Sequence, residues 1–126
     1  MSIALWIAAA LLAVAFVVAG MTKLFSSRAQ LEKNMAWVKD SSMGFVRILG
    51  LLEVLGAIGV IVPGAFGIAG FLVPWAAIGL AVLMAGAIVV HVQRGEGLKA
   101  AAPAIVLLVL AVFVAWGRFG PYAFTS

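Results

Sequence analysis

The sequence predicts an all-α membrane protein with four antiparallel transmembrane helices and a short amphipathic interfacial helix between the first and the second. Four apolar runs, at about 3–22, 45–62, 71–90 and 102–117, fill most of the 126 residues. Each run is about long enough to cross a bilayer as a helix. Hydrophobic residues make up 67% of the chain and charged residues only 10%, whereas soluble domains carry roughly 25% charge. We therefore expect a single membrane domain, 1–126.

The basic residues are distributed unevenly along the chain. Seven of the eight Lys and Arg residues lie in or beside the loops that follow the first and third runs, and only Arg118 lies near the opposite end. Basic residues favour the cytoplasmic side of a membrane. We therefore expect loops 24–43 and 92–101 in the cytoplasm, both termini outside, and a location in the cell (inner or plasma) membrane. No basic stripe with interleaved aromatic residues is present, so nucleic acid is not an expected partner.

The first transmembrane helix is expected at about 3–24. Small residues on one of its faces, among them Gly20, allow a neighbouring helix to approach closely. Lys23 ends the apolar run. The first run also lacks the basic start of a signal peptide, so we expect it to remain as a helix of the protein.

The only truly polar stretch, residues 26–43, follows the first helix. Ser27 with Gln30 three residues later is typical of a capping box. After this box, one helical face carries the apolar side chains Leu31, Met35 and Val38. We interpret residues 27–39 as an amphipathic helix lying at the cytoplasmic interface, with a plain solvated loop as the alternative.

The remaining transmembrane helices are expected at about 44–62, 71–91 and 102–117. Pro63 and the glycine after it should close the second helix, because proline removes a backbone donor. Pro103 should lie in the first turn of the fourth helix, where proline is favoured. The short connection between the second and third helices is typical of antiparallel neighbours.

Glu53 lies near the middle of the second expected span, roughly 13 Å along the axis at about 1.5 Å per residue. A carboxylate at that depth costs several kcal/mol unless it is protonated, paired or hydrated. Small residues share its helix face, so Glu53 should point into the bundle. Lys23 and His91, which end the first and third spans on the same side, are candidate partners, while Arg118 ends the fourth span on the other side.

Alternative interpretations of Lys23, Glu53, His91 and Arg118 stay open. In one, Lys23 and Glu53 form a buried ion pair that fixes helix register, and His91 caps the cluster. In another, the cluster lines a polar cavity for a proton, a quinone or a lipid-like ligand. A third makes His91 and Arg118 simple markers of the membrane interfaces. The single histidine matches no metal-ligand spacing, and a chain without cysteine has no disulfide or thiolate chemistry.

Several motifs occur in a fixed order along the chain. Residues 19–24 read AGMTKL, residues 50–59 read GLLEVLGAIG with a proline soon after, and residues 79–87 read GLAVLMAGA ahead of His91. With Arg118 near the end, this set resembles the DoxX-like family of small four-helix integral membrane proteins. The likeness covers essentially the whole chain, and its most specific part is the ordered set of Lys23, Glu53, His91 and Arg118 at helix-specific places, within the patterns AGxxKL and GxxExxGAxG…P.

The resemblance implies a four-helix bundle whose core polar residues, Lys23, Glu53, His91 and Arg118, form a ligand-binding or structural cluster. The family's namesake is similar to a small subunit of a quinone-linked oxidase. The resemblance therefore implies an accessory membrane subunit, or a small lipophile-binding bundle, associated with a membrane redox complex. It would work with a quinone or a lipid and carry no covalently bound cofactor. Its partners would be the lipid bilayer and other membrane redox subunits, with a homo-oligomer left open.

Two further hypotheses come from other functional classes. Small membrane bundles can act as enzymes on lipophilic substrates, and here Glu53 and His91 would serve as acid and base. In that case the purified chain alone would show turnover. A small transporter is the third hypothesis, and it is disfavoured because the sequence lacks broken helices at matching positions of two repeats.

Overall fold

The structure, a computed structural model, describes residues 2–120, 122 and 123 and contains no strand in that part of the chain. Its elements, in order, are α1 (Ser2–Phe25), α2 (Arg28–Asn34), the 3-10 helix η1 (Ala36–Asp40), α3 (Met43–Phe66), α4 (Leu72–Gln93) and α5 (Gly97–Phe119). Four of them, α1, α3, α4 and α5, are long and apolar enough to cross a membrane. The all-α membrane fold predicted from the apolar runs is confirmed.

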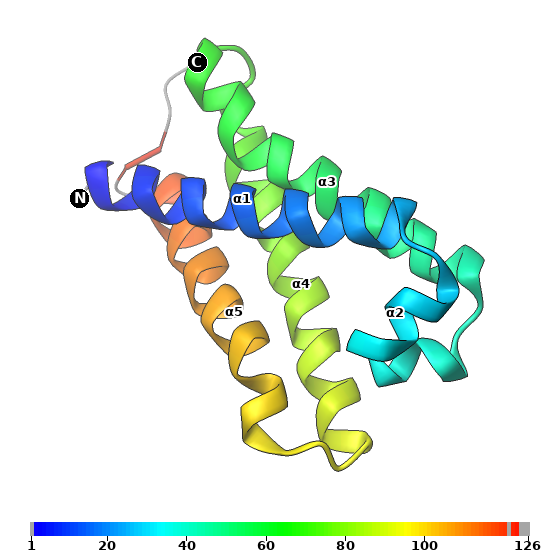
Figure 1. Cartoon of the computed structure of the whole chain (residues 1–126). Coiled ribbons are helices and arrows are strands. Elements are labelled where there is room, and N and C mark those ends of the chain that lie inside the picture. The colour runs from blue at the N-terminus through cyan, green and yellow to red at the C-terminus, as the bar shows by residue number, and fades with distance from the viewer. Residues whose placement is uncertain (1, 121, 124–126) are drawn as a thin grey trace.

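The four long helices form two antiparallel hairpins, α1 with α3 and α4 with α5 (Figure 1). The hairpins cross each other, so that α3 also packs on α4 and α1 on α5. They meet near the start of α1 and diverge toward the loop between α4 and α5, and α2 lies toward this wider end (Figure 1).

The core lies where the hairpins cross. Every long helix contributes buried side chains to it, including Phe16, Ala57, Leu80 and Val114. Many of these residues are small, which lets the helices pack closely. Large apolar side chains also cover the outside of all four helices. This outward apolar surface contacts the lipid bilayer, since lipid is the solvent of a membrane-spanning bundle.

The polar stretch after α1 differs in part from the expected helix at 27–39. The capping box is confirmed: the Gln30 amide donates to Ser27 Oγ at 3.3 Å, and the Ser27 amide donates to Gln30 Oε1 at 3.4 Å. The helix, however, breaks at Met35, whose φ of −133° and ψ of 94° are extended, and η1 then begins. Folding back at this break brings Leu31 and Val38 into a small second core. The break in the helix allows this apolar face to be buried, which is favourable, and for this reason the segment does not form one continuous helix.

The Arg28 guanidinium holds the folded-back segment in place. It donates to the carbonyls of Val38 and Lys39 at 3.1 and 3.3 Å, and to Glu32 at 2.7 Å on its own helix. The Val38 carbonyl also accepts from the Ser41 amide at 3.1 Å, so Arg28 adds a second hydrogen bond there and ties the start of α2 to the end of η1.

Both proline-based boundaries were wrong. α3 continues through Pro63 to Phe66 and ends at Gly67, whose φ of 65° is left-handed. α5 begins at Gly97, so that Pro103 lies inside it. Proline is tolerated within membrane helices because neighbouring groups compensate for the lost hydrogen bond. The alanine-rich residues ahead of Pro103 also have high helix propensity.

Candidate functional site

Lys23 of α1 and Glu53 of α3 form the most buried ion pair in the described part of the chain. Lys23 Nζ lies 2.7 Å from Glu53 Oε1, and the two side chains are only 12% and 5% exposed. Lys23 stands in the last turn of α1, while Glu53 lies in the middle of α3. The long lysine stem therefore carries its ammonium inward to the level of the carboxylate. At this distance the contact is a charge-assisted hydrogen bond.

A glycine precedes each of these charged residues by three positions. A Cβ placed on Gly20 would lie 2.6 Å from the Gly50 carbonyl oxygen, and one on Gly50 would lie 2.8 Å from the Gly20 carbonyl oxygen. Real Cβ atoms do not approach that closely, so only glycine fits at either position. Residues three apart lie on the same face of a helix. The glycine contact thus brings α1 and α3 together on the face that carries Lys23 and Glu53.

Arg47 strengthens the same junction from the first turns of α3. Its Nη1 donates to the carbonyls of Lys23 and Ser26 at 2.6 and 2.9 Å. Carbonyls at the end of a helix have no partner within it, and basic side chains commonly bond them. The cation also faces the negative end of the α1 dipole. The sequence analysis did not predict this role of Arg47. The signal that could have indicated it is a basic residue near the start of α3, which can bond the last carbonyls of α1.

His91 is held at the end of α4 by a contact with the loop between α4 and α5. Its Nδ1 lies 2.6 Å from Glu96 Oε1, and Arg94 Nε donates to Glu96 Oε2 at 3.3 Å. Arg94 also forms an ion pair with Asp40 of η1. This chain of contacts ties the loop between α4 and α5 to the polar segment before α3.

The charges around Glu96 favour its ionised form. The hydrogen bond from His91, with a second from Arg94, holds the pKa of Glu96 below its ordinary value, although burial acts in the opposite direction. An ionised carboxylate only accepts hydrogen bonds. Glu96 is therefore the acceptor in its contacts with His91 and Arg94.

Arg118 lies at the opposite end of the molecule and is only 6% exposed. Its guanidinium carbon is 5.5 Å from the centre of the Trp6 ring, and Nη1 donates to the Tyr122 carbonyl at 2.9 Å. A guanidinium over an indole ring makes a favourable cation–π contact. The neighbouring Gly117 packs directly against Leu5, so α5 and α1 are joined at this end.

The structure therefore brings together only two of the four residues singled out from sequence. Lys23 and Glu53 meet, whereas His91 contacts Glu96 and Arg118 contacts Trp6. In the described part of the chain, Glu53 and His91 make no hydrogen bond or ion pair with each other. His91 thus caps no cluster with Lys23 and Glu53. The sequence prediction also missed the partners that the loop supplies, Glu96 and Arg94.

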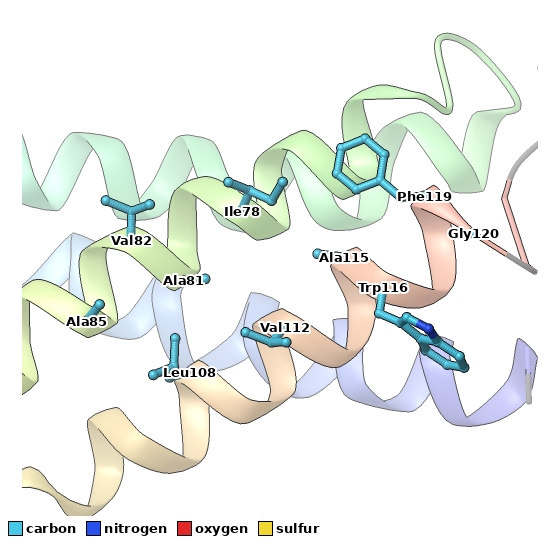
Figure 2. A pocket seen from close by; sticks show the side chains of 10 residues that line it. All are labelled: Ile78, Ala81, Val82, Ala85, Leu108, Val112, Ala115, Trp116, Phe119 and Gly120. Carbon is cyan, nitrogen blue, oxygen red and sulfur yellow. The ribbon is translucent and has the colours of Figure 1, made fainter.

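An apolar groove of about 660 Å³ runs between α4 and α5 on the outside of the bundle. Figure 2 shows α4 and α5 side chains lining it, with Phe119 and Trp116 toward one end. Alanines line part of the groove, and their short side chains leave it unfilled. The lining consists of Ile78, Ala81, Val82, Ala85, Leu108, Val112, Ala115, Trp116, Phe119 and Gly120.

Among the residues that the structure describes, no three His, Cys, Asp or Glu side chains converge as a metal site.

Comparisons with known proteins place the chain in a family. No curated protein and no solved structure matches the chain. A family model does match, that of the DoxX-like family, and it covers residues 7–114. With most of its length matched, and with four membrane-spanning helices, the chain belongs to the DoxX-like family of membrane proteins.

Proposed function

We propose that this protein is an accessory integral-membrane subunit of the cell membrane, and that it holds a quinone-type lipophile beside a membrane redox complex. The observation that carries the proposal is the apolar groove between α4 and α5 (Figure 2). The resemblance to a family whose namesake is similar to a subunit of a quinone-linked oxidase supports the redox partner.

The groove has the size and the chemistry that a lipophile requires. Its volume of about 660 Å³ falls within the roughly 300–1,000 Å³ typical of small-molecule sites. Trp116 stacks on Phe113 with ring centres 6.1 Å apart, and Phe119 meets Trp75 edge-on at 5.1 Å. These contacts fix aromatic rings at one end, where a quinone ring can stack. The exposed side chain of Val82 then offers an apolar path for the isoprenoid tail.

We infer structural roles for the four polar residues first considered as the site. Lys23 and Glu53 neutralise each other between α1 and α3, and Arg118 is engaged by Trp6 and the carbonyl of Tyr122. His91 is held by Glu96 in the loop region. An acid–base pair of Glu53 and His91 therefore has no support, and the proposal includes no catalytic step.

Quinone binding tests the groove directly. We expect a short-chain quinone to quench the tryptophan fluorescence of purified protein with saturation. Ala85→Leu places a larger side chain in the groove and should weaken binding by at least about tenfold, equivalent to about 1.4 kcal/mol. Ala10→Leu is the matched control, because Ala10 is exposed on α1, outside the groove. Equal, non-saturating quenching in all three proteins would reject the groove as the site.

The redox partnership needs a separate experiment. Purification of the tagged chain in mild detergent, followed by mass spectrometry, should recover quinone-linked redox subunits in near-stoichiometric amounts. If the chain were recovered alone from membranes that contain such complexes, the subunit role would be rejected. The ligand-binding role would still be tested by the quenching experiment.

A further inference from the structure

A second hollow lies at the basic end of the bundle, between the last turn of α1 and α2. Its volume is about 420 Å³, and its lining consists of Thr22, Ser26, Gln30, Leu31 and Lys33. Unlike the groove between α4 and α5, it presents mostly polar groups: two hydroxyls, an amide and an ammonium. The Thr22 hydroxyl already donates to the Val18 carbonyl at 2.7 Å, so the groups that can donate into the hollow are the Ser26 hydroxyl, the Gln30 amide and the Lys33 ammonium.

The electrostatics of this hollow favour an anion. Among the described residues that line it, Lys33 carries the only charge. The nearby carboxylates are already neutralised, because Glu32 is paired with Arg28 and Glu53 with Lys23. A cation also stands at the negative end of α1, where Arg47 donates to the carbonyls of Lys23 and Ser26. An anion in the hollow would therefore meet an ammonium without facing an uncompensated negative group.

The walls of the hollow are fixed by the fold. Leu31 is fully buried in the second core with Val38 and Val46, which anchors α2 against η1 and the start of α3. The capping box holds Gln30 against the first turn of α2. A site whose backbone walls are held in place loses less entropy on binding than one that must first fold.

The surface next to the hollow is apolar. On α1, Val18, Met21 and Phe25 are 61%, 44% and 75% exposed, and they lie within two turns of Thr22 and Ser26. The last turn of a membrane-spanning helix lies at the headgroup level. The site therefore combines an anion-binding hollow with an adjoining hydrocarbon-facing surface.

We propose that this hollow binds the phosphate headgroup of an anionic phospholipid in the leaflet at the basic end of the bundle. The Lys33 ammonium and the Ser26 hydroxyl hold the phosphate oxygens, and the acyl chains lie along α1. Basic residues near a membrane surface attract anionic lipids by about 1 kcal/mol each. The site is separate from the groove between α4 and α5, so it stands without a quinone.

Lipid titration of the delipidated full chain in mild detergent tests the proposal. Native mass spectrometry should show phosphatidylglycerol binding roughly five- to tenfold more tightly than phosphatidylcholine, as expected for one added charge contact. Lys33→Gln should abolish this preference, and Ser26→Ala should reduce it. Lys99→Gln, which removes an exposed lysine of α5 outside the hollow, should leave it unchanged.

Three outcomes would overturn the proposal. Equal affinity of the wild-type chain for the two lipids would show that the hollow does not select an anion. An equal loss in Lys33→Gln and Lys99→Gln would indicate diffuse charge attraction in place of a site. If soluble glycerol 3-phosphate displaced the lipid at equal concentration, the hollow would be a site for free phosphate compounds. Thermal unfolding of each variant confirms that it is folded before its binding is compared.

Discussion

The charges of Lys23 and Glu53 matter for stability because neither side chain has ready access to water. Removing one partner of a buried pair leaves the other charged and uncompensated. Replacing both partners by apolar groups is often tolerated, since the desolvation penalty then disappears as well. The stability of the junction therefore depends on matched partners more than on charge itself.

Single and double replacements at this pair should give strongly non-additive results. Lys23→Met or Glu53→Leu alone should lower the free energy of unfolding by about 3–5 kcal/mol, the usual penalty for an unpaired buried charge. The double variant should regain more than half of that loss. Reversible unfolding of all four proteins in detergent measures the coupling, and simple additivity of the two losses would contradict the structural role.

Glu96 makes the stability of the loop end depend on pH. Its pKa is lowered in the folded protein by the hydrogen bonds from His91 and Arg94. A group with a lowered folded pKa contributes stability above its unfolded pKa and loses it as pH falls through the folded value. The melting temperature of Glu96→Gln should therefore lie below that of the wild type at pH 7. The gap should close as pH falls below the ordinary value of 4.5; an unchanged gap at pH 3.5 would be inconsistent with this role.

The contacts of Glu96 show which side-chain pairs can be predicted from the sequence and which cannot. Lys23 and Glu53 were considered as partners because both are charges on predicted spans, where few partners exist. The turn that brings Glu96 onto His91 depends instead on Gly95 and Gly97, whose φ values of 67° and 85° are left-handed. Spacing alone does not give the direction of such a turn, so the contact could not be predicted.

At the scale of helices, the crossing of α1 and α3 depends on two glycines. Gly20 and Gly50 let the backbones touch, so a methyl group at either position meets a carbonyl oxygen that cannot move away on its own. Close backbone approach at small residues is a common source of helix association in membranes. The crossing therefore fixes the register at which Lys23 reaches Glu53.

Alanine substitutions should separate this packing role from helix propensity. Gly20→Ala should destabilise the protein by about 1–3 kcal/mol, as overpacking does. Gly79→Ala is the matched control, because a Cβ there meets nothing within 4 Å, and it should be neutral or stabilise by up to about 1 kcal/mol. Chemical unfolding of both variants measures the difference, and equal effects would contradict the close crossing.

The helix ends show where sequence rules failed. The four apolar runs predicted the four long helices because the bilayer thickness sets the length of a spanning helix. The rule that proline ends a helix failed at Pro63 and Pro103, since membrane helices tolerate proline. The break at Met35 was also missed, because it depends on tertiary burial of Leu31 and Val38.

At the scale of the whole molecule, the two hairpins place the polar contacts at opposite ends. The pair of Asp40 and Arg94 joins the two loops at one end, and Arg118 with Trp6 joins α1 to α5 at the other. Between them the surface is apolar on all long helices. The groove between α4 and α5 could not be predicted from sequence, because it depends on how these two helices sit beside each other.

The orientation of the bundle in the cell membrane is the last prediction. Seven of the eight Lys and Arg residues belong to the loop end, and basic loops favour the cytoplasmic side of a membrane, so we expect this end in the cytoplasm. Because the chain has no cysteine, single cysteines report their own position without background. In intact cells, Ser2→Cys should react with a membrane-impermeant maleimide, whereas Lys99→Cys should react only after permeabilisation. The cysteine-free protein is the control. Labelling of Lys99→Cys alone in intact cells would place the basic loops outside and reverse the proposed orientation.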